Sequence, residues 1–150
     1  MIPEQPIMKR LILTLAFVVA AAGTPAIAQP SVGVRVEFQG PGGHSFGAYG
    51  RVSALHAASR TVILLQKALP AGSYQITNLT GGNSVNAIAS DGLIELKLTA
   101  RGAKAYETLV AAVTKAAEEG AAAENAFRGV KAGDLTAGAP ATVRSSVTRF

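Results

Sequence analysis

Histidine is the residue type best suited here to proton transfer or metal binding, and the sequence contains two. His44 lies in a glycine-rich run, and His56 lies in a segment with helical spacing. A catalytic zinc ion needs about three protein ligands and one open position. Neither histidine begins a His-x-Asp or His-x-x-x-His pair, and the sequence has no cysteine that could add a thiolate ligand. We therefore expect no metal site and no self-contained catalytic site in this chain.

His44 is open to two interpretations. The first is a loop histidine whose ring hydrogen-bonds to nearby backbone, which composition alone favours. The second is an imidazole offered to a ligand oxygen, because imidazole is a good hydrogen-bond donor near neutral pH. His56 is expected to be structural or exposed.

Two other features carry chemically useful groups. Glu118 and Glu119 are adjacent acids in an alanine-rich segment, and this pattern is typical of a solvated helix face rather than of a catalytic pair. The glycine-rich run at residues 40–50 lacks the Gly-Lys-Ser/Thr ending of a phosphate-binding loop and does not follow the dinucleotide-binding pattern. Its glycines favour positive φ angles and a close approach of backbone segments.

The N-terminal segment has the pattern of a signal peptide. Lys9 and Arg10 precede the apolar run Leu11–Ala22, and Ala26–Ala28 gives a small-x-small cleavage pattern. Cleavage after Ala28 leaves residues 29–150 as one domain in the periplasm or outside the cell, without membrane attachment. An uncleaved N-terminal anchor is the alternative, although the run is short for a span of about 20 residues. Translation could begin at either Met1 or Met8.

The net charge of +5 comes from basic residues that are scattered along the chain. Nucleic-acid-binding proteins usually cluster such residues on one face, often with aromatic residues between them. We therefore expect no nucleic-acid partner, and we interpret the charge as a contribution to solubility. Without cysteine, no disulfide can form, so stability must come from packing.

Hydrophobic periodicity predicts three strands and two helices. Apolar residues alternate with polar ones at residues 32–39, which indicates a strand with one buried face. Apolar residues at three- and four-residue spacing indicate amphipathic helices. The expected elements after the first strand are a helix from Arg51 to Leu69, a strand at Ser73–Leu79, a strand at Gly92–Thr99 and a helix at Gly102–Ala123.

The fourth strand is less well defined, at either Thr142–Arg149 or Val130–Thr136. With it, the order strand–helix–strand–strand–helix–strand is that of the split βαβ arrangement. We therefore predict an α+β fold, a ferredoxin-like sandwich of a four-stranded antiparallel sheet with two helices on one face.

Two glycine-bearing motifs on either side of the first helix resemble those of the lid, or dimerisation, domain of M20 metallopeptidases. They are Gly40–Gly50, GPGGHSFGAYG, and Gly81–Ala89, GGNSVNAIA. The separation of the motifs and the order of the elements agree with that family over Val32–Ala123. In the family, this domain is inserted into a catalytic domain that holds two zinc ions, and it pairs with its copy in a second subunit.

The resemblance implies a role for two residues and leaves the catalytic domain unaccounted for. The histidine that matches His44 is implied to lie near the substrate carbonyl of the neighbouring subunit, and the asparagine that matches Asn86 is implied to help hold substrate. Both would be substrate-binding residues in trans. The sequence departs from the family where the third strand ends, because Lys97 and Thr99 stand in place of an Asp-x-Arg pattern.

Three functions remain open at the level of sequence. The first is an exported non-catalytic module that forms a homodimer or pairs with an M20 peptidase subunit. The second is a split-enzyme subunit that supplies His44 and Asn86 to the zinc site of a separate M20 peptidase or amidohydrolase, so that zinc belongs only to that partner. The third is the remnant of a truncated peptidase gene. For the first, we expect a symmetric dimer, because Val32–Gln39 has little of the lysine, proline or bulge protection of an exposed edge strand.

Overall fold

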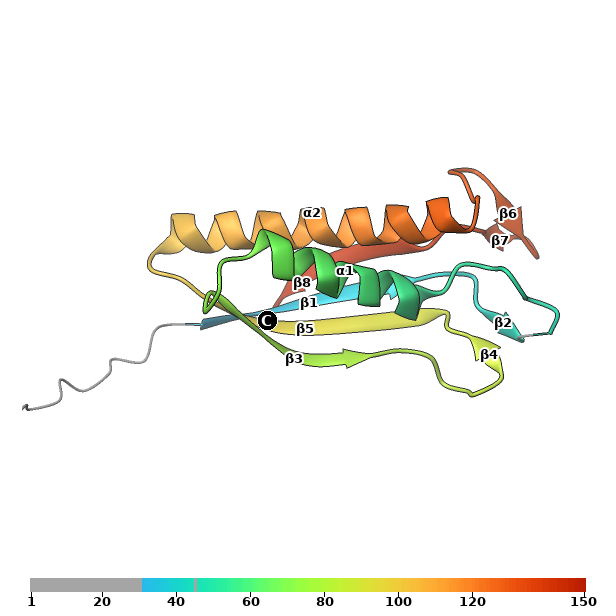
Figure 1. The fold of residues 1–150 in the computed structure, drawn as a ribbon, viewed down its shortest axis with the longest axis horizontal. Coiled ribbons are helices and arrows are strands. Elements are labelled where there is room, and N and C mark those ends of the chain that lie inside the picture. The colour runs from blue at the N-terminus through green and yellow to red at the C-terminus, as the bar shows by residue number, and fades with distance from the viewer. Residues whose placement is uncertain (1–30, 45) are drawn as a thin grey trace, which may run out of the picture.

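The computed structural model describes residues 31–44 and 46–150, which form one sheet-and-helix domain (Figure 1). The signal peptide expected at residues 1–28 lies outside the described residues. The elements are β1 (Ser31–Gln39), β2 (Gly43–His44), α1 (Ala54–Ala68), β3 (Tyr74–Thr80), β4 (Ala87–Ile88), β5 (Asp91–Thr99), α2 (Ala103–Phe127), β6 (Leu135–Thr136), β7 (Ala139–Pro140) and β8 (Arg144–Arg149).

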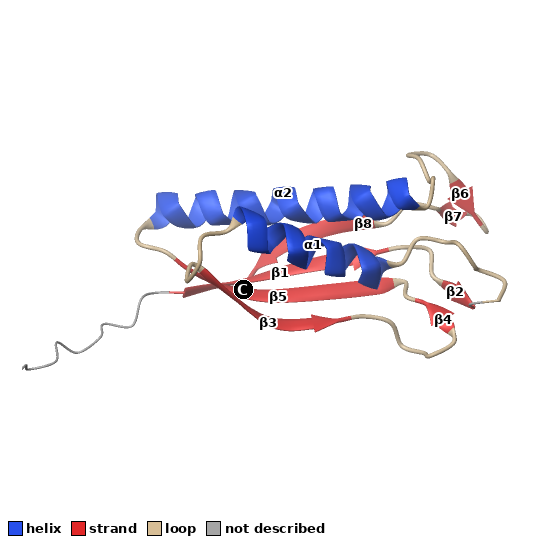
Figure 2. Ribbon diagram, viewed as in Figure 1, coloured by secondary structure: helices blue, strands red, loops and turns tan. Residues whose placement is uncertain are grey.

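The main sheet has four antiparallel strands in the order β3-β5-β1-β8. Strand β1 pairs with β5 from Ser31 opposite Thr99 to Gln39 opposite Asp91. Both helices cover one face of this sheet (Figure 2). The predicted fold class, an α+β split βαβ sandwich, is therefore confirmed.

The expectation that Val32–Gln39 presents an exposed edge is wrong. Strand β1 is an inner strand, since β8 pairs with its second side from Val34 opposite Arg149 to Gln39 opposite Arg144. The edges of the sheet are β3 and β8. The alternation of residues within a strand predicts which face is buried, but it carries no information on which strands become neighbours.

The core lies between the sheet and the two helices. The alternate residues of β1 and β5 that face the helices are fully or almost fully buried: Val34, Val36, Phe38, Ile94, Leu96 and Leu98. This is the face that the period of two predicts. Burial of each such side chain stabilises the fold by about 1.5–3 kcal/mol relative to exposure.

The two helices approach each other closely because small residues line their contact. On α1 the buried residues are Ala54, Ala57, Ala58, Thr61 and Leu65, and on α2 the buried stretch after Val113 is Ala116, Ala117, Gly120, Ala121 and Glu124. A Cβ added to Gly120 would lie 2.0 Å from Oγ1 of Thr61. The alanine-rich part of α2, which appears weakly amphipathic in the sequence, is therefore a tight helix–helix interface.

The helix ends differ from those predicted. Helix α1 begins at Ala54 rather than Arg51, because the Ser53 hydroxyl caps it by accepting from the His56 backbone N–H at 3.4 Å. Helix α2 continues to Phe127, beyond the predicted end at Ala123, and its last turns contain the buried Glu124. Among the described residues, no helix is long and apolar enough to cross a membrane.

The fourth strand forms at Arg144–Arg149, which confirms the first of the two predicted positions. In the second, Val130–Thr136, only Leu135–Thr136 is extended, as half of the small β6–β7 ladder. The Asn125 amide fixes the entry to β8, since it donates to the Val143 carbonyl at 3.0 Å and accepts from the Val143 N–H at 2.8 Å.

Candidate functional site

The two residues singled out by sequence lie side by side at a small second sheet, in which His44 belongs to β2 and Asn86 directly precedes β4. Strands β2 and β4 pair antiparallel, with Gly43 opposite Ile88 and His44 opposite Ala87. This sheet lies at the end of the molecule where α1 begins and α2 ends (Figure 1). It joins the glycine-rich run to the second motif, although about 40 residues of sequence separate the two.

The side chains of His44 and Asn86 are in contact and exposed. Nδ2 of Asn86 lies 3.5 Å from Nε2 of His44, and the Ser84 hydroxyl donates to Oδ1 of Asn86. Because Ser84 occupies the amide oxygen, the NH₂ group of Asn86 is turned toward the imidazole. The His44 tautomer with a proton on Nε2 would place two N–H donors close enough to bind one ligand oxygen.

The loop that carries His44 is held by a residue that the sequence analysis missed. Nη1 of Arg51 donates to the Gly42 carbonyl at 3.0 Å. Gly43 has φ +136, and a Cβ there would lie 2.8 Å from the same Nη1 and 2.7 Å from Cβ of Ala48. The glycine thus leaves room for the guanidinium beneath the loop. The sequence signal that could have identified Arg51 is its position directly after the glycine-rich run.

The loop that carries Asn86 is tied to the start of β5. The Gly82 N–H donates to Oδ2 of Asp91 at 3.3 Å, and a Cβ added to Gly81 would lie 2.5 Å from the Asp91 carbonyl oxygen. The Ala54 N–H at the start of α1 donates to the Ala89 carbonyl at 3.0 Å. The loop of His44 is therefore held by Arg51, just before α1, and the loop of Asn86 is held by Ala54, the first residue of α1.

Large apolar side chains stand exposed on the two loops that carry this pair. Phe46 and Tyr49 are 92% and 93% exposed on the first loop, and Val85 is fully exposed on the second. Ligand-binding sites usually combine apolar side chains with a small number of polar groups that fix the orientation of the ligand. The site thus has donors for an oxygen atom and apolar surface for the atoms beside it.

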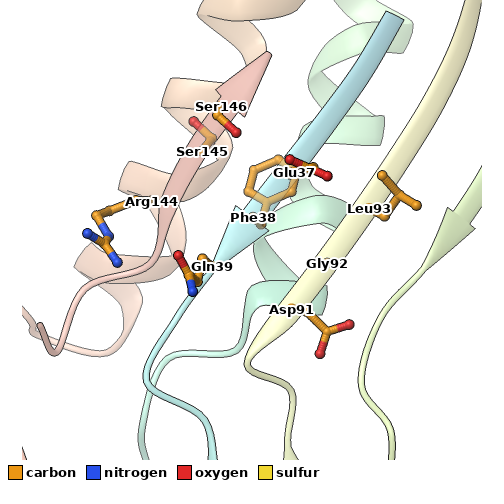
Figure 3. A pocket seen from close by; sticks show the side chains of 9 residues that line it. All are labelled: Glu37, Phe38, Gln39, Asp91, Gly92, Leu93, Arg144, Ser145 and Ser146. Carbon is orange, nitrogen blue, oxygen red and sulfur yellow. The ribbon is translucent and has the colours of Figure 1, made fainter. Parts of the chain in front are cut away.

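A separate hollow of about 650 Å³ lies over the ends of β1, β5 and β8 (Figure 3). Its lining includes Glu37, Asp91 and Arg144, and the last two extend toward opposite sides of it (Figure 3). Its charged groups do not converge on one point, and neither His44 nor Asn86 lines it. It is a weaker candidate site than the His44–Asn86 pair.

Within residues 31–44 and 46–150, no group of three His, Cys, Asp or Glu side chains could hold a metal ion. Both histidines belong to the described part, and His56 lies near only one carboxylate in it, that of Glu124, with 3.7 Å between Nδ1 and Oε1. The residues described do not fit a zinc site.

Comparison with known proteins identifies the family. The family model for the M20 peptidase dimerisation domain matches residues 29–125. The chain belongs to the M20 peptidase dimerisation domain family. The resemblance of the two glycine-bearing motifs to this family is therefore confirmed. A search of curated proteins found no match.

Solved structures show that the M20 dimerisation domain fold is shared with larger proteins. A hydantoinase/carbamoylase family amidase from Burkholderia ambifaria aligns with a TM-score of 0.57 and 18% identity over 81% of this chain and 28% of its own. A tripeptidase from Staphylococcus aureus aligns with a TM-score of 0.56 and 15% identity over 79% of this chain and 28% of its own. A dinuclear metal-binding M20 peptidase from Bacillus subtilis aligns with a TM-score of 0.54 and 16% identity over 81% of this chain and 26% of its own.

The chain thus spans little more than a quarter of the length of each of these three solved proteins. At these identities the likeness concerns the fold, which is that of the M20 dimerisation domain. The activity and substrates of the larger proteins do not follow from it.

Proposed function

We propose that this chain is an exported, non-catalytic module that forms a homodimer through the free edge of β3. The observation that carries the proposal is the character of that edge. Tyr74–Thr80 has no charged residue and no proline, and its outer side is unpaired in the described chain. Such an edge is a template for strand addition. Membership of a dimerisation domain family supports self-association.

The other edge strand, β8, is protected against pairing with another chain in the ways expected of a monomeric protein. Strand β8 begins and ends with arginine, and Arg149 is held in an ion pair with Glu107 of α2. Charged residues at an edge disfavour pairing with another chain. On β3 the one irregularity in the pairing with β5 is a register shift between Ile76 and Asn78, after which Leu79 is 43% exposed. We expect the partner strand to contact this part of β3.

The sequence supports the remaining parts of the proposal. The predicted signal peptide supports a periplasmic or secreted location. The chain has two histidines and no cysteine, and the described residues fit a zinc site poorly. Both observations support a module whose own residues perform no metal-dependent hydrolysis.

Light scattering coupled to size-exclusion chromatography at micromolar concentration tests self-association. We expect a mass of two chains for the wild-type protein and a mass of one chain for Leu79→Lys. The matched control is Leu135→Lys, which adds the same charge at a residue 69% exposed in the β6–β7 ladder. A single-chain wild-type mass that does not change with concentration would refute the homodimer, and equal effects of the two substitutions would place the interface elsewhere.

The contact between His44 and Asn86 favours a second candidate function. The pair would supply hydrogen-bond donors, in trans, to the substrate oxygen bound at the zinc site of a separate M20 hydrolase chain. Removal of one hydrogen-bond donor aimed at a developing oxyanion typically lowers the reaction rate by about 100-fold or more. The exposed position of both side chains at one end of the domain is compatible with delivery to another protein.

This second function is tested by adding the purified protein to an M20 peptidase from which its own lid domain has been deleted. We expect added protein to raise dipeptide hydrolysis, and His44→Ala to abolish most of that increase. His56→Ala is the matched control, because it removes the other histidine of the chain, which lies in the first turn of α1. An increase that His44→Ala and His56→Ala leave equally intact would contradict a role for His44.

A further inference from the structure

Among the described residues, Glu124 is the one charged residue whose side chain is fully buried. Its carboxylate accepts three hydrogen bonds: from the Ser53 N–H at 3.1 Å, from Nε of Arg60 at 3.0 Å and from Nε of Arg128 at 3.3 Å. A buried charge is tolerated when it is paired and hydrogen-bonded in this way. Glu124 thus anchors one arginine of α1 and the arginine that caps the C-terminal end of α2.

The cluster carries more positive than negative charge. One carboxylate faces two guanidinium groups, and Nδ1 of the exposed His56 lies a further 3.7 Å from Oε1. Even with His56 neutral, the cluster retains one net positive charge. Because Arg60 and Arg128 remain 37% and 26% exposed, this charge faces solvent.

Phe127 holds the two guanidinium groups in place from the outside. The guanidinium carbon of Arg60 lies 4.9 Å from the centre of the Phe127 ring, and that of Arg128 lies 5.0 Å from it. These are cation–π distances. The ring itself is 66% exposed, so it is not a core residue. The two arginines are therefore ordered by a buried carboxylate and an exposed ring together.

Both arginines keep donors free for another molecule. Each binds Glu124 through Nε, and within the described residues their terminal nitrogens make no hydrogen bond. A guanidinium that is already oriented loses little conformational entropy when it binds a carboxylate through those nitrogens. Arginine and aromatic residues are also the types that dominate the binding energy of protein interfaces.

We propose that Arg60, Phe127 and Arg128 form a docking surface for an acidic segment of a partner protein. Carboxylates of the segment bind the terminal nitrogens of the two arginines, and an apolar side chain of the segment covers the Phe127 ring. The charge complementarity of the cluster selects an acidic partner rather than a neutral one. Its residues belong to α1, to the end of α2 and to the cap that follows it, and none of them is part of the β3 edge or of the His44–Asn86 pair.

Fluorescence anisotropy with a labelled peptide of alternating glutamate and leucine tests this surface, with the glutamine–leucine peptide as its neutral counterpart. We expect the purified protein to bind the acidic peptide at low salt and not the neutral one. Phe127→Ala and Arg128→Gln should each weaken binding by about tenfold, as substitution of an interface hot spot does. Added salt should weaken binding further, because the contact is between exposed charges.

The matched control is Arg101→Gln, which removes the same charge from an exposed residue before α2. It should leave the affinity unchanged. Phe127→Ala keeps all three hydrogen bonds of Glu124, so it tests the surface even where Arg128→Gln unfolds the protein. The proposal is overturned by absent binding, by equal binding of the two peptides, by an unchanged affinity in Phe127→Ala, or by equal losses in Arg128→Gln and Arg101→Gln.

Discussion

At the scale of the residue, the end of the molecule that carries His44 depends on a small number of specific contacts. Glu124 holds the Ser53 N–H, and Ser53 in turn caps α1. Two residues earlier, Arg51 supports the loop of His44 through the Gly42 carbonyl. A single buried carboxylate on α2 thus fixes the segment from which the His44 loop is supported.

Removal of the Glu124 carboxylate should therefore be costly. We expect Glu124→Ala to lower the free energy of unfolding by about 1–3 kcal/mol, because it leaves the buried Ser53 N–H without its acceptor. Glu124→Gln keeps an acceptor for the Ser53 N–H and should cost less. Urea denaturation measures both. Equal stability of wild type and Glu124→Ala would show that the pairing contributes nothing to the fold.

At the scale of the element, the contact between α1 and α2 is set by the absence of side-chain atoms. Gly120 gives Thr61 the space in which its hydroxyl donates to the Ala57 carbonyl at 2.9 Å. Small residues at a helix crossing allow the axes to approach and bury the backbone of each helix against the other. The helix pair is therefore sensitive to added volume rather than to lost volume.

Gly120→Ala separates the effect of helix propensity from that of packing, since the two predict changes in protein stability of opposite sign. Propensity alone would stabilise the protein by about 1 kcal/mol. We expect destabilisation by about 1–3 kcal/mol instead, because the added Cβ overlaps Oγ1 of Thr61. In a double-mutant cycle, Thr61→Ala should offset part of this cost. A more stable Gly120→Ala protein would contradict the close contact.

Strand β8 is joined to α2 by the ion pair of Arg149 and Glu107, with N–O distances of 2.8 and 2.6 Å. The hydrogen bond from Arg149 lowers the pKa of Glu107 below its ordinary value of 4.5. A lowered folded-state pKa stabilises the protein above the unfolded-state pKa and ceases to do so as the pH falls through the folded-state value. The contribution is therefore present at neutral pH and absent in strong acid.

We expect Glu107→Gln to be less stable than wild type at pH 7, and the difference to vanish as the pH falls below 4.5. Thermal unfolding across this pH range measures it. The control is Glu118→Gln, which removes a carboxylate from an exposed residue of the same helix that makes no ion pair within the described residues. A difference between Glu107→Gln and wild type that persists in acid would exclude the ion pair as its cause.

At the scale of the whole molecule, three surfaces of different character lie on one small domain. The edge of β3 is neutral and unpaired, the His44–Asn86 pair is polar on loops with exposed apolar side chains, and the Arg60–Phe127–Arg128 surface is basic around one ring. The last two lie near the end where α1 begins and α2 ends (Figure 1). A module with these surfaces suits assembly with other chains.

The predicted signal peptide leads to a prediction for the whole chain. We expect the exported protein to begin at Gln29, because Ala26–Ala28 has the small residues that signal peptidase requires. Intact-mass measurement of periplasmic material tests this. A mass that retains Met8–Ala28 would show that the segment remains as an anchor.

The sequence by itself determined the local structure and the family. Alternation at residues 32–39 and 92–99 predicted the buried faces of β1 and β5, and the two glycine motifs predicted the M20 dimerisation domain. Both signals are local, since each depends on residues within a single strand or loop. The helices were predicted for the same reason, although their ends depend on capping and on contacts with other elements.

Only the tertiary structure decided which elements became neighbours. It placed β8 beside β1, which moved the exposed edge from β1 to β3, and it brought His44 to Asn86. It also buried Glu124, which in the sequence is one more glutamate of an alanine-rich helix. Pairing and burial depend on residues far apart in the chain, and their energies depend on the partner that each group meets, so periodicity within one segment carries no information on them.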